Sequence, residues 1–153
     1  MSSDTIEHRM ANLIFTLRQK CYTKDMYFVH SFNITLAEYN CLVLFFSRDS
    51  YGVKDLAKAL DITPGGVTRI ITSLEKKGIV KRQISREDRR NIIVSLTKKG
   101  SNMVERLREA SVELHGKILD QMEPGSQETV LKALQHLTEA IDGWVVEHTQ
   151  NKK

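Results

Sequence analysis

The stretch from Val53 to Gly78, VKDLAKALDITPGGVTRIITSLEKKG, contains two short helical patterns separated by a turn. Thr63 is a favourable N-cap residue, and Pro64 takes the first position of the second helix, where its missing N–H costs nothing. A glycine follows the last periodic residue and ends that helix. Two short helices joined by a tight turn form a helix-turn-helix, which we therefore expect over residues 53–76.

The pattern changes after Gly78, where apolar residues recur at every second position. This period is typical of β-strands, and we expect strands over residues 79–84 and 91–97. The loop between them is charged and carries three arginines. An antiparallel hairpin directly after a helix-turn-helix is a wing. We therefore expect a wing over residues 79–97 and a winged helix-turn-helix lobe over about residues 35–99.

Amphipathic helical patterns flank this lobe. Apolar residues recur at helical spacing over residues 5–22 and again, in two long runs, over residues 101–147. Thr35 and Glu38 form a capping box that opens a further helix, because each side chain can satisfy a free amide of the first turn. We expect a mainly α fold of about six helices with a small β-wing, in a single domain spanning residues 1–153.

The composition is that of a globular chain, with 153 residues of which 41% are hydrophobic and 27% charged. The longest apolar run is six residues, far fewer than the roughly 20 that a membrane helix needs, so no membrane association is expected. Two cysteines cannot staple a domain of this size, which favours a reducing, cytoplasmic compartment. The sequence has no nucleophile, phosphate-loop or dinucleotide-binding motif, and its five histidines lack metal-ligand spacing. We therefore expect neither an enzyme nor a metal or cofactor site.

Charge is unevenly distributed along the chain. Residues 54–99 hold 12 Lys and Arg against 5 Asp and Glu, a net charge of +7, while the whole chain carries +4 and the remainder therefore −3. A basic segment in a near-neutral protein indicates a polyanion-binding surface, although an ordinary solvated basic face is the alternative interpretation. Thr68, Arg69 and Thr72 lie on the exposed face of the second helix, the element that enters the major groove of DNA in a helix-turn-helix.

The segment Val53–Gly78, its continuation IVKR (79–82) and the segment DRRNIIVSLTKKG (88–100) together resemble the helix-turn-helix, wing and following helix of MarR-type transcription regulators. The capping box at Thr35 also matches the start of the second helix in that family. The resemblance implies a homodimer built from the first helix and the last two helices. It further implies a sequence-specific regulator, which we interpret as a repressor, that binds a pseudo-palindromic operator and is released by a small aromatic compound or an oxidant.

The resemblance also assigns candidate contacts with double-stranded DNA. In the wing it implies that Asp88 orients Arg90 toward the minor groove. Gly65 and Gly66 stand where family members often carry Ser or Thr, so backbone amides rather than side chains would meet the DNA there. We expect four further cations to contact phosphates or to add to the positive field rather than to read bases: Lys76, Lys77, Lys81 and Arg82. The candidate DNA-binding residues are Thr63, Gly65, Gly66, Thr68, Arg69, Thr72, Lys76, Arg86, Asp88, Arg89 and Arg90.

Other residues carry further expectations. Cys41 lies in an apolar run and is expected in the core, whereas Cys21 is the candidate for a redox switch. Trp144 continues a helical apolar stripe and is expected in core or dimer packing rather than in a cofactor site. Aromatic residues near the junction of the lobe with the flanking helices either line an effector site or fill the core; they are Tyr22, Tyr27, Phe28, Phe32 and Tyr39. Two other functions stay open: a nonspecific architectural DNA binder, and a winged-helix module that binds proteins.

Overall fold

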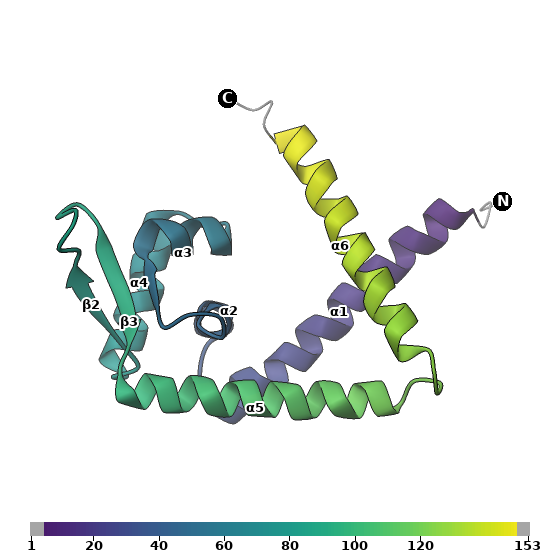
Figure 1. Ribbon diagram of the computed structural model, residues 1–153, viewed down its shortest axis with the longest axis horizontal. Helices are drawn as coiled ribbons and strands as arrows, with labels where there is room; N and C mark the ends of the chain where they lie inside the picture. Colours follow the sequence, from purple (N-terminus) through teal and green to yellow (C-terminus); the bar gives the residue numbers. More distant parts are fainter. Residues whose placement is uncertain (1–4, 150–153) are drawn as a thin grey trace. The chain divides into compact units, whose positions relative to one another are not determined.

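A computed structural model describes residues 5–149 of the chain, shown in Figure 1. The helices are α1 (Ile6–Phe32), α2 (Leu36–Leu44), α3 (Val53–Leu60), α4 (Pro64–Lys76), α5 (Lys98–Asp120) and α6 (Gln127–Thr149). The strands are β1 (Ser50–Gly52), β2 (Val80–Ile84) and β3 (Ile92–Leu96). In the described part of the chain, six helices and one small antiparallel sheet confirm the predicted mainly α fold with a β-wing.

The chain divides into two compact units, one up to Glu109 and the other from Ala110 onward. Helix α5 begins in the first unit and ends in the second. The first unit contains α1 to α4, the sheet and the start of α5, and we call its part from α2 to the start of α5 the winged lobe.

Helix α4 forms because both its start and one of its faces are satisfied locally. The Thr63 hydroxyl accepts the Gly66 N–H at 3.1 Å, and Pro64 occupies the first helical turn. Asp61 ends the preceding α3 in the left-handed conformation, with φ of 52°, and so turns the chain into α4. The buried face of α4 consists of Val67, Ile71 and Leu74. This burial leaves the opposite face of the helix to solvent.

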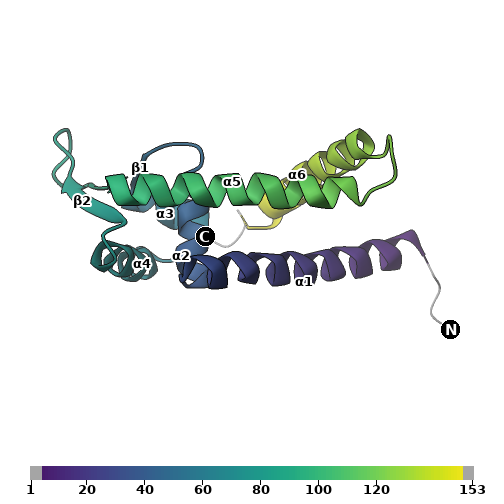
Figure 2. The same ribbon diagram turned by 90° about the horizontal axis from the view of Figure 1, so that it is seen from below.

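The three strands form one antiparallel sheet in the order β1–β3–β2. Strands β2 and β3 are the predicted wing, with Arg82 opposite Val94. The sequence pattern does not predict β1, because three residues are too few to show a period. Tyr51 holds β1 in place: it pairs with Val94, and its ring lies 5.1 Å from that of Phe45 in an edge-to-face contact. Figure 2 shows the loop between β2 and β3 projecting beyond the helices of the winged lobe.

Helix α1 continues to Phe32, so the predicted end near residue 22 is wrong. The apolar pattern fades there because the side chains change their surroundings: the first part of the helix is largely exposed, whereas Phe28 and Val29 are buried. The Phe28 ring stacks on Tyr39 of α2 with the centroids 5.9 Å apart. Asn33, with φ of 52°, then ends the helix in the left-handed conformation.

The start of α5 belongs to the winged lobe. Thr97 donates its hydroxyl to the Gly78 carbonyl at 2.6 Å and accepts the Gly100 N–H at 3.0 Å. The helix backbone approaches the strand so closely that a Cβ on Gly100 would collide with the carbonyl oxygen of Ile79. Only glycine fits this contact, which joins the wing to the helix that follows it.

The second unit contains the end of α5 and all of α6. The side-chain amide of Gln127 donates to the Leu119 carbonyl at 3.1 Å and closes the turn between the two helices. None of the described residues of α6 is buried in the single chain. Large apolar side chains of α6 that stay at least 40% exposed are Leu131, Leu134, Ile141, Trp144, Val145 and Val146. No helix within residues 5–149 is long and apolar enough to cross a membrane.

Candidate nucleic-acid interface

The outer face of α4 presents the residues that the sequence assigns to major-groove contact. Thr68 and Arg69 are exposed, and Thr72 is half-buried at the edge of the packed face. The Thr68 hydroxyl donates to the Pro64 carbonyl at 3.0 Å, which leaves its oxygen free to accept only. Arg69 and Lys76 are the long cationic side chains on this face of α4, and both are exposed.

Two glycines, Gly65 and Gly66, follow Pro64, so the first turn of α4 has no side chains at these positions. A Cβ at Gly65 would meet only the Thr63 hydroxyl, at 3.9 Å, and one at Gly66 would make ordinary contacts of 3.4 Å and longer. Packing therefore does not require glycine at either position. The consequence of having it is a helix N-terminus whose backbone can be approached closely, a geometry that suits an anion such as a phosphate.

The loop at the tip of the wing is closed by hydrogen bonds within the loop. The Ser85 N–H donates to the Asn91 carbonyl at 2.8 Å and the Asn91 N–H to the Asp88 carbonyl at 2.9 Å. The Ser85 hydroxyl accepts the Glu87 and Asp88 amides, each at 3.3 Å. These bonds give the loop a defined backbone without using a cationic side chain.

Three exposed arginines extend from this loop: Arg86, Arg89 and Arg90. The carboxylate of Asp88 accepts the backbone N–H of Arg90 at 2.9 Å. Asp88 therefore acts on the backbone that carries Arg90. The guanidinium groups remain at the surface of the wing.

Two cations next to these elements form ion pairs within the winged lobe. Lys77 pairs with Glu38 at 2.7 Å, and Arg82 pairs with Glu75 at 2.6 Å. Both residues were expected to contact phosphates or to add to the positive field, and the structure shows that Lys77 also bridges α4 to α2 and Arg82 bridges β2 to α4. Lys76 and Lys81 are exposed, as is Arg82.

Glu38 is the buried carboxylate of the winged lobe, with only 1% of the residue exposed. Burial opposes its ionisation, but hydrogen bonds from Lys77, Ser73 and the Thr35 amide outweigh that effect and lower the pKa of Glu38 below its ordinary value. The capping box predicts the bond to Thr35. The bonds to α4 span 35 and 39 residues, and the local pattern contains no signal for them.

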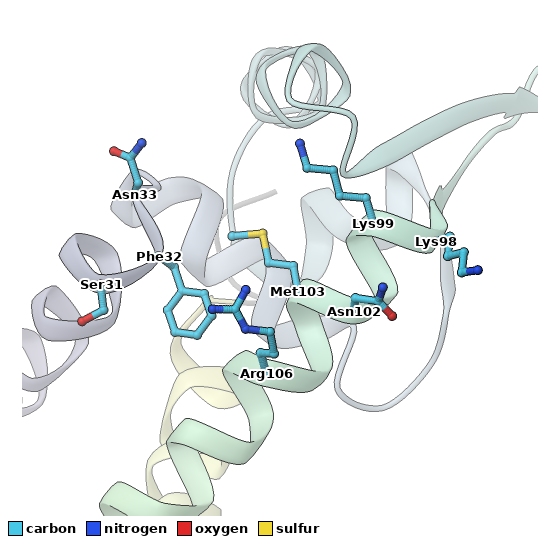
Figure 3. Close-up of a pocket in the computed structure, with 8 residues that line it drawn as sticks. All are labelled: Ser31, Phe32, Asn33, Lys98, Lys99, Asn102, Met103 and Arg106. Atoms are coloured by element: carbon cyan, nitrogen blue, oxygen red, sulfur yellow. The ribbon is translucent and has the colours of Figure 1, made fainter.

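A cavity of about 680 Å³ lies in the first unit between the end of α1 and the start of α5. Figure 3 shows Arg106 beside the ring of Phe32, with the guanidinium carbon 5.7 Å from the ring centroid. The lining is basic and polar and consists of Ser31, Phe32, Asn33, Lys98, Lys99, Asn102, Met103 and Arg106. Of the five aromatic residues considered above, Phe32 lines this cavity.

The other aromatic and cysteine residues have different surroundings. Phe28 and Tyr39 are buried, whereas Tyr22 and Tyr27 are exposed. Cys41 is buried, and burial together with the charge of Glu38 raises the pKa of its thiol to about 12, so it is protonated at neutral pH. Cys21 is exposed. Within residues 5–149, no group of three or more His, Cys, Asp or Glu side chains could hold a metal ion.

A capped helix-turn-helix, followed by a hairpin with a basic tip, defines a winged helix-turn-helix protein. Residues 34–92 match the model of the MarR family. Among curated relatives, the organic hydroperoxide resistance transcriptional regulator of Bacillus subtilis is 26% identical over 74% of this chain and 75% of its own length. The transcriptional regulator PrsX of Escherichia coli is 32% identical over 66% of this chain and 62% of its own.

Solved structures show the same fold. FabT of Streptococcus pneumoniae, solved in complex with DNA, gives a TM-score of 0.78 at 22% identity, over 90% of this chain and 99% of that one. A MarR regulator of Methanosarcina mazei gives 0.75 at 20% identity, over 91% and 99%. Residues 34–92 are therefore similar to the MarR family, and the curated relatives matched here are transcriptional regulators.

Proposed function

We propose that this protein is a sequence-specific DNA-binding transcriptional repressor with no catalytic role of its own. The observation that carries the proposal is the combination, in one lobe, of an exposed Arg69 face on α4 and three exposed arginines on the wing tip. A single helix fits the major groove, and an arginine on a β-ribbon beside it suits the narrow, electronegative minor groove. Such a regulator acts where the chromosome is, so a cytoplasmic location is part of the proposal.

The proposal includes a homodimer formed through the helices outside the winged lobe. Exposed apolar side chains recur along α1 at Ile6, Met10, Leu13 and Leu17. Helix α6 has a second such stripe and, in its described residues, no buried residue at all. Stripes of this length are unusual on a monomer, and a second copy of the chain would cover them. A two-fold dimer in turn requires a pseudo-palindromic operator whose half-sites lie about one helical turn, 34–36 Å, apart.

The proposal also includes release by a small-molecule or oxidant signal. The cavity beside Phe32 combines an aromatic ring with Arg106, Lys98 and Lys99, a lining that suits a small aromatic acid. Since Cys41 is buried and protonated, an oxidant signal would act at Cys21. In either case the signal must change the affinity of the protein for DNA, because linkage requires a different binding free energy in the two states.

The test of the core proposal is selection of bound duplexes from a random pool, followed by salt titrations on the selected operator and on a scrambled duplex. A regulator should prefer the operator by roughly 10³-fold or more. Equal affinity for both duplexes would favour the nonspecific architectural binder. No binding to either would favour a protein-interaction module. Salicylate added to the operator complex tests the effector, and binding of salicylate without a change in operator affinity would remove that part of the proposal.

A further inference from the structure

The last turn of α4 is tied to three different elements by polar side chains. Ser73 and Lys77 both donate to Glu38 of α2, at 2.6 and 2.7 Å. Glu75 accepts two hydrogen bonds from the guanidinium of Arg82 in β2, at 2.6 and 3.0 Å. The carbonyl of Lys77 accepts the ammonium of Lys99 in α5 at 2.8 Å. The orientation of the C-terminal end of α4 is therefore fixed by directional hydrogen bonds as well as by apolar packing.

Glu38 occupies the centre of this arrangement. Its Oε1 accepts the Ser73 hydroxyl, and its Oε2 accepts both the Lys77 ammonium and the Thr35 N–H, the latter at 2.9 Å. Removing one partner of a buried carboxylate is costly, because the charge that remains has lost its compensation. Apolar packing of a helix face is not directional and tolerates small rotations, whereas this set of bonds is satisfied in only one orientation of α4.

Ser73 lies one helical turn after Arg69, so the two side chains leave α4 on the same side. A rotation of α4 that broke the Ser73–Glu38 bond would therefore swing Arg69 as well. We propose that Glu38 is a positioning residue, which fixes the rotation of α4 and hence the direction in which Thr68, Arg69 and Thr72 face. This inference rests on the proposed function, because it concerns how α4 presents its outer face to DNA.

Glu38 has a second role that must be separated from this one, since it also caps α2. The Thr35 hydroxyl accepts the Glu38 N–H at 3.1 Å and takes no part in the bonds to α4. Thr35→Ala therefore weakens the cap of α2 and leaves the contacts of Glu38 with α4 in place. Ser73→Ala does the opposite, because it removes a bond to α4 and leaves the cap. These two variants form a matched pair.

The experiment compares wild type, Ser73→Ala, Glu38→Gln and Thr35→Ala for binding to the selected operator and to a scrambled duplex. We expect Ser73→Ala and Glu38→Gln to lower operator affinity about ten-fold, the change produced by about 1.4 kcal/mol. Affinity for the scrambled duplex should change little, so that discrimination falls. Thr35→Ala should keep wild-type discrimination even though it unfolds at a lower denaturant concentration. Discrimination that falls equally in all three variants, or in none, would overturn the inference.

A second measurement on the free protein needs no DNA. Hydrogen exchange of the amides of residues 73–77 should accelerate in Ser73→Ala and Glu38→Gln but not in Thr35→Ala. If the wild type binds no duplex, the proposed function fails, and the exchange data still decide whether Glu38 holds α4. If exchange in residues 73–77 is the same in all variants, the inference fails whatever the DNA measurements show.

Discussion

In the single chain, the winged lobe buries its apolar side chains, whereas helix α6 leaves its apolar side chains exposed. In the described chain every buried apolar residue lies between Phe28 and Leu107, and α6 contains none. Yet α4 and α6 carry apolar residues at the same helical spacing in the sequence. The period of a pattern shows that one face will be covered, and it does not show whether the cover comes from the same chain or from another. The winged lobe buries its apolar residues within one chain, whereas the cover that we propose for α6 is a second copy of the chain.

The largest expected effect comes from breaking this requirement in α6. Leu134→Asp combined with Ile141→Asp places two charges on the exposed stripe and should convert the proposed dimer to a monomer. Operator affinity should then fall by about 10²–10⁴-fold, because the second half-site no longer binds at high effective concentration. Sedimentation and operator binding measure the two effects. Gln135→Asp is the control, and a monomeric double variant that binds the operator at full affinity would contradict the proposed dimer.

The next prediction compares a buried and an exposed aromatic residue. Phe45 of the winged lobe is 1% exposed, whereas Phe15 of α1 is 55% exposed. Phe45→Ala should lower the free energy of unfolding by about 3–5 kcal/mol, because it leaves a cavity beside Tyr51. This loss should not depend on protein concentration. Phe15 lies on the opposite side of α1 from the stripe of Ile6, Met10, Leu13 and Leu17, so Phe15→Ala should change the free energy of unfolding by less than about 0.5 kcal/mol at either protein concentration. Urea unfolding at two concentrations of each variant separates the cases.

The sequence predicts the winged lobe better than it predicts the helices outside this lobe. The helix-turn-helix and the wing could be predicted, since caps, a stop glycine and a change of period all occur within a few residues of each other. The end of α1 could not, because Phe28 packs on Tyr39 of α2 and Val29 is buried, while the earlier apolar residues of the same helix stay exposed. A helix whose surroundings change along its length has no single apolar face that a periodicity argument could detect.

The candidate site divides in a similar way. Exposure of Arg69 and of the wing arginines follows from local pattern and is confirmed. The ion pairs of Lys77 and Arg82 could not be predicted, because charged residues far apart in the sequence show no period that links them. Counting positive charge along the chain therefore overstates the charge available to a partner, since both of these cations already have a carboxylate in the winged lobe.

The third prediction concerns Arg90, whose contact with the Asp88 carboxylate is made by its backbone N–H and not by its guanidinium. Arg90→Ala should weaken operator binding by about 1–3 kcal/mol and lower the salt slope by about one per subunit, with the dimer and its folding intact. The preferred core sequence should stay the same, because an arginine in a minor groove reads width and potential more than base identity. Arg9→Ala, an exposed cation at the start of α1, is the control. Wild-type binding by Arg90→Ala at about 150–200 mM salt would mean that the wing is only an exposed hairpin.

The smallest expected effect is a change in how stability depends on pH. Hydrogen bonds from Lys77, Ser73 and the Thr35 amide outweigh burial and lower the pKa of Glu38 below its ordinary value of 4.5. The stabilisation by this carboxylate is therefore fully present above pH 4.5 and is lost as the pH falls through the lower pKa of the folded state. Burial and the charge of Glu38 raise the pKa of the neighbouring Cys41 thiol to about 12, so this thiol stays protonated throughout that range.

Glu38→Gln should accordingly be less stable than wild type by about 1 kcal/mol at pH 7, and the difference should shrink steadily below pH 4.5. Glu113→Gln is the matched control, because hydrogen bonding to Lys117 also lowers the pKa of Glu113, but at a fully exposed position on α5. An exposed pair of this kind is screened by solvent, so Glu113→Gln should follow the wild-type pH profile. Urea unfolding of the three proteins between pH 3 and 7 makes the comparison. If Glu38→Gln shows the same offset from wild type at every pH, the carboxylate of Glu38 is not the charged centre that holds α4 to α2.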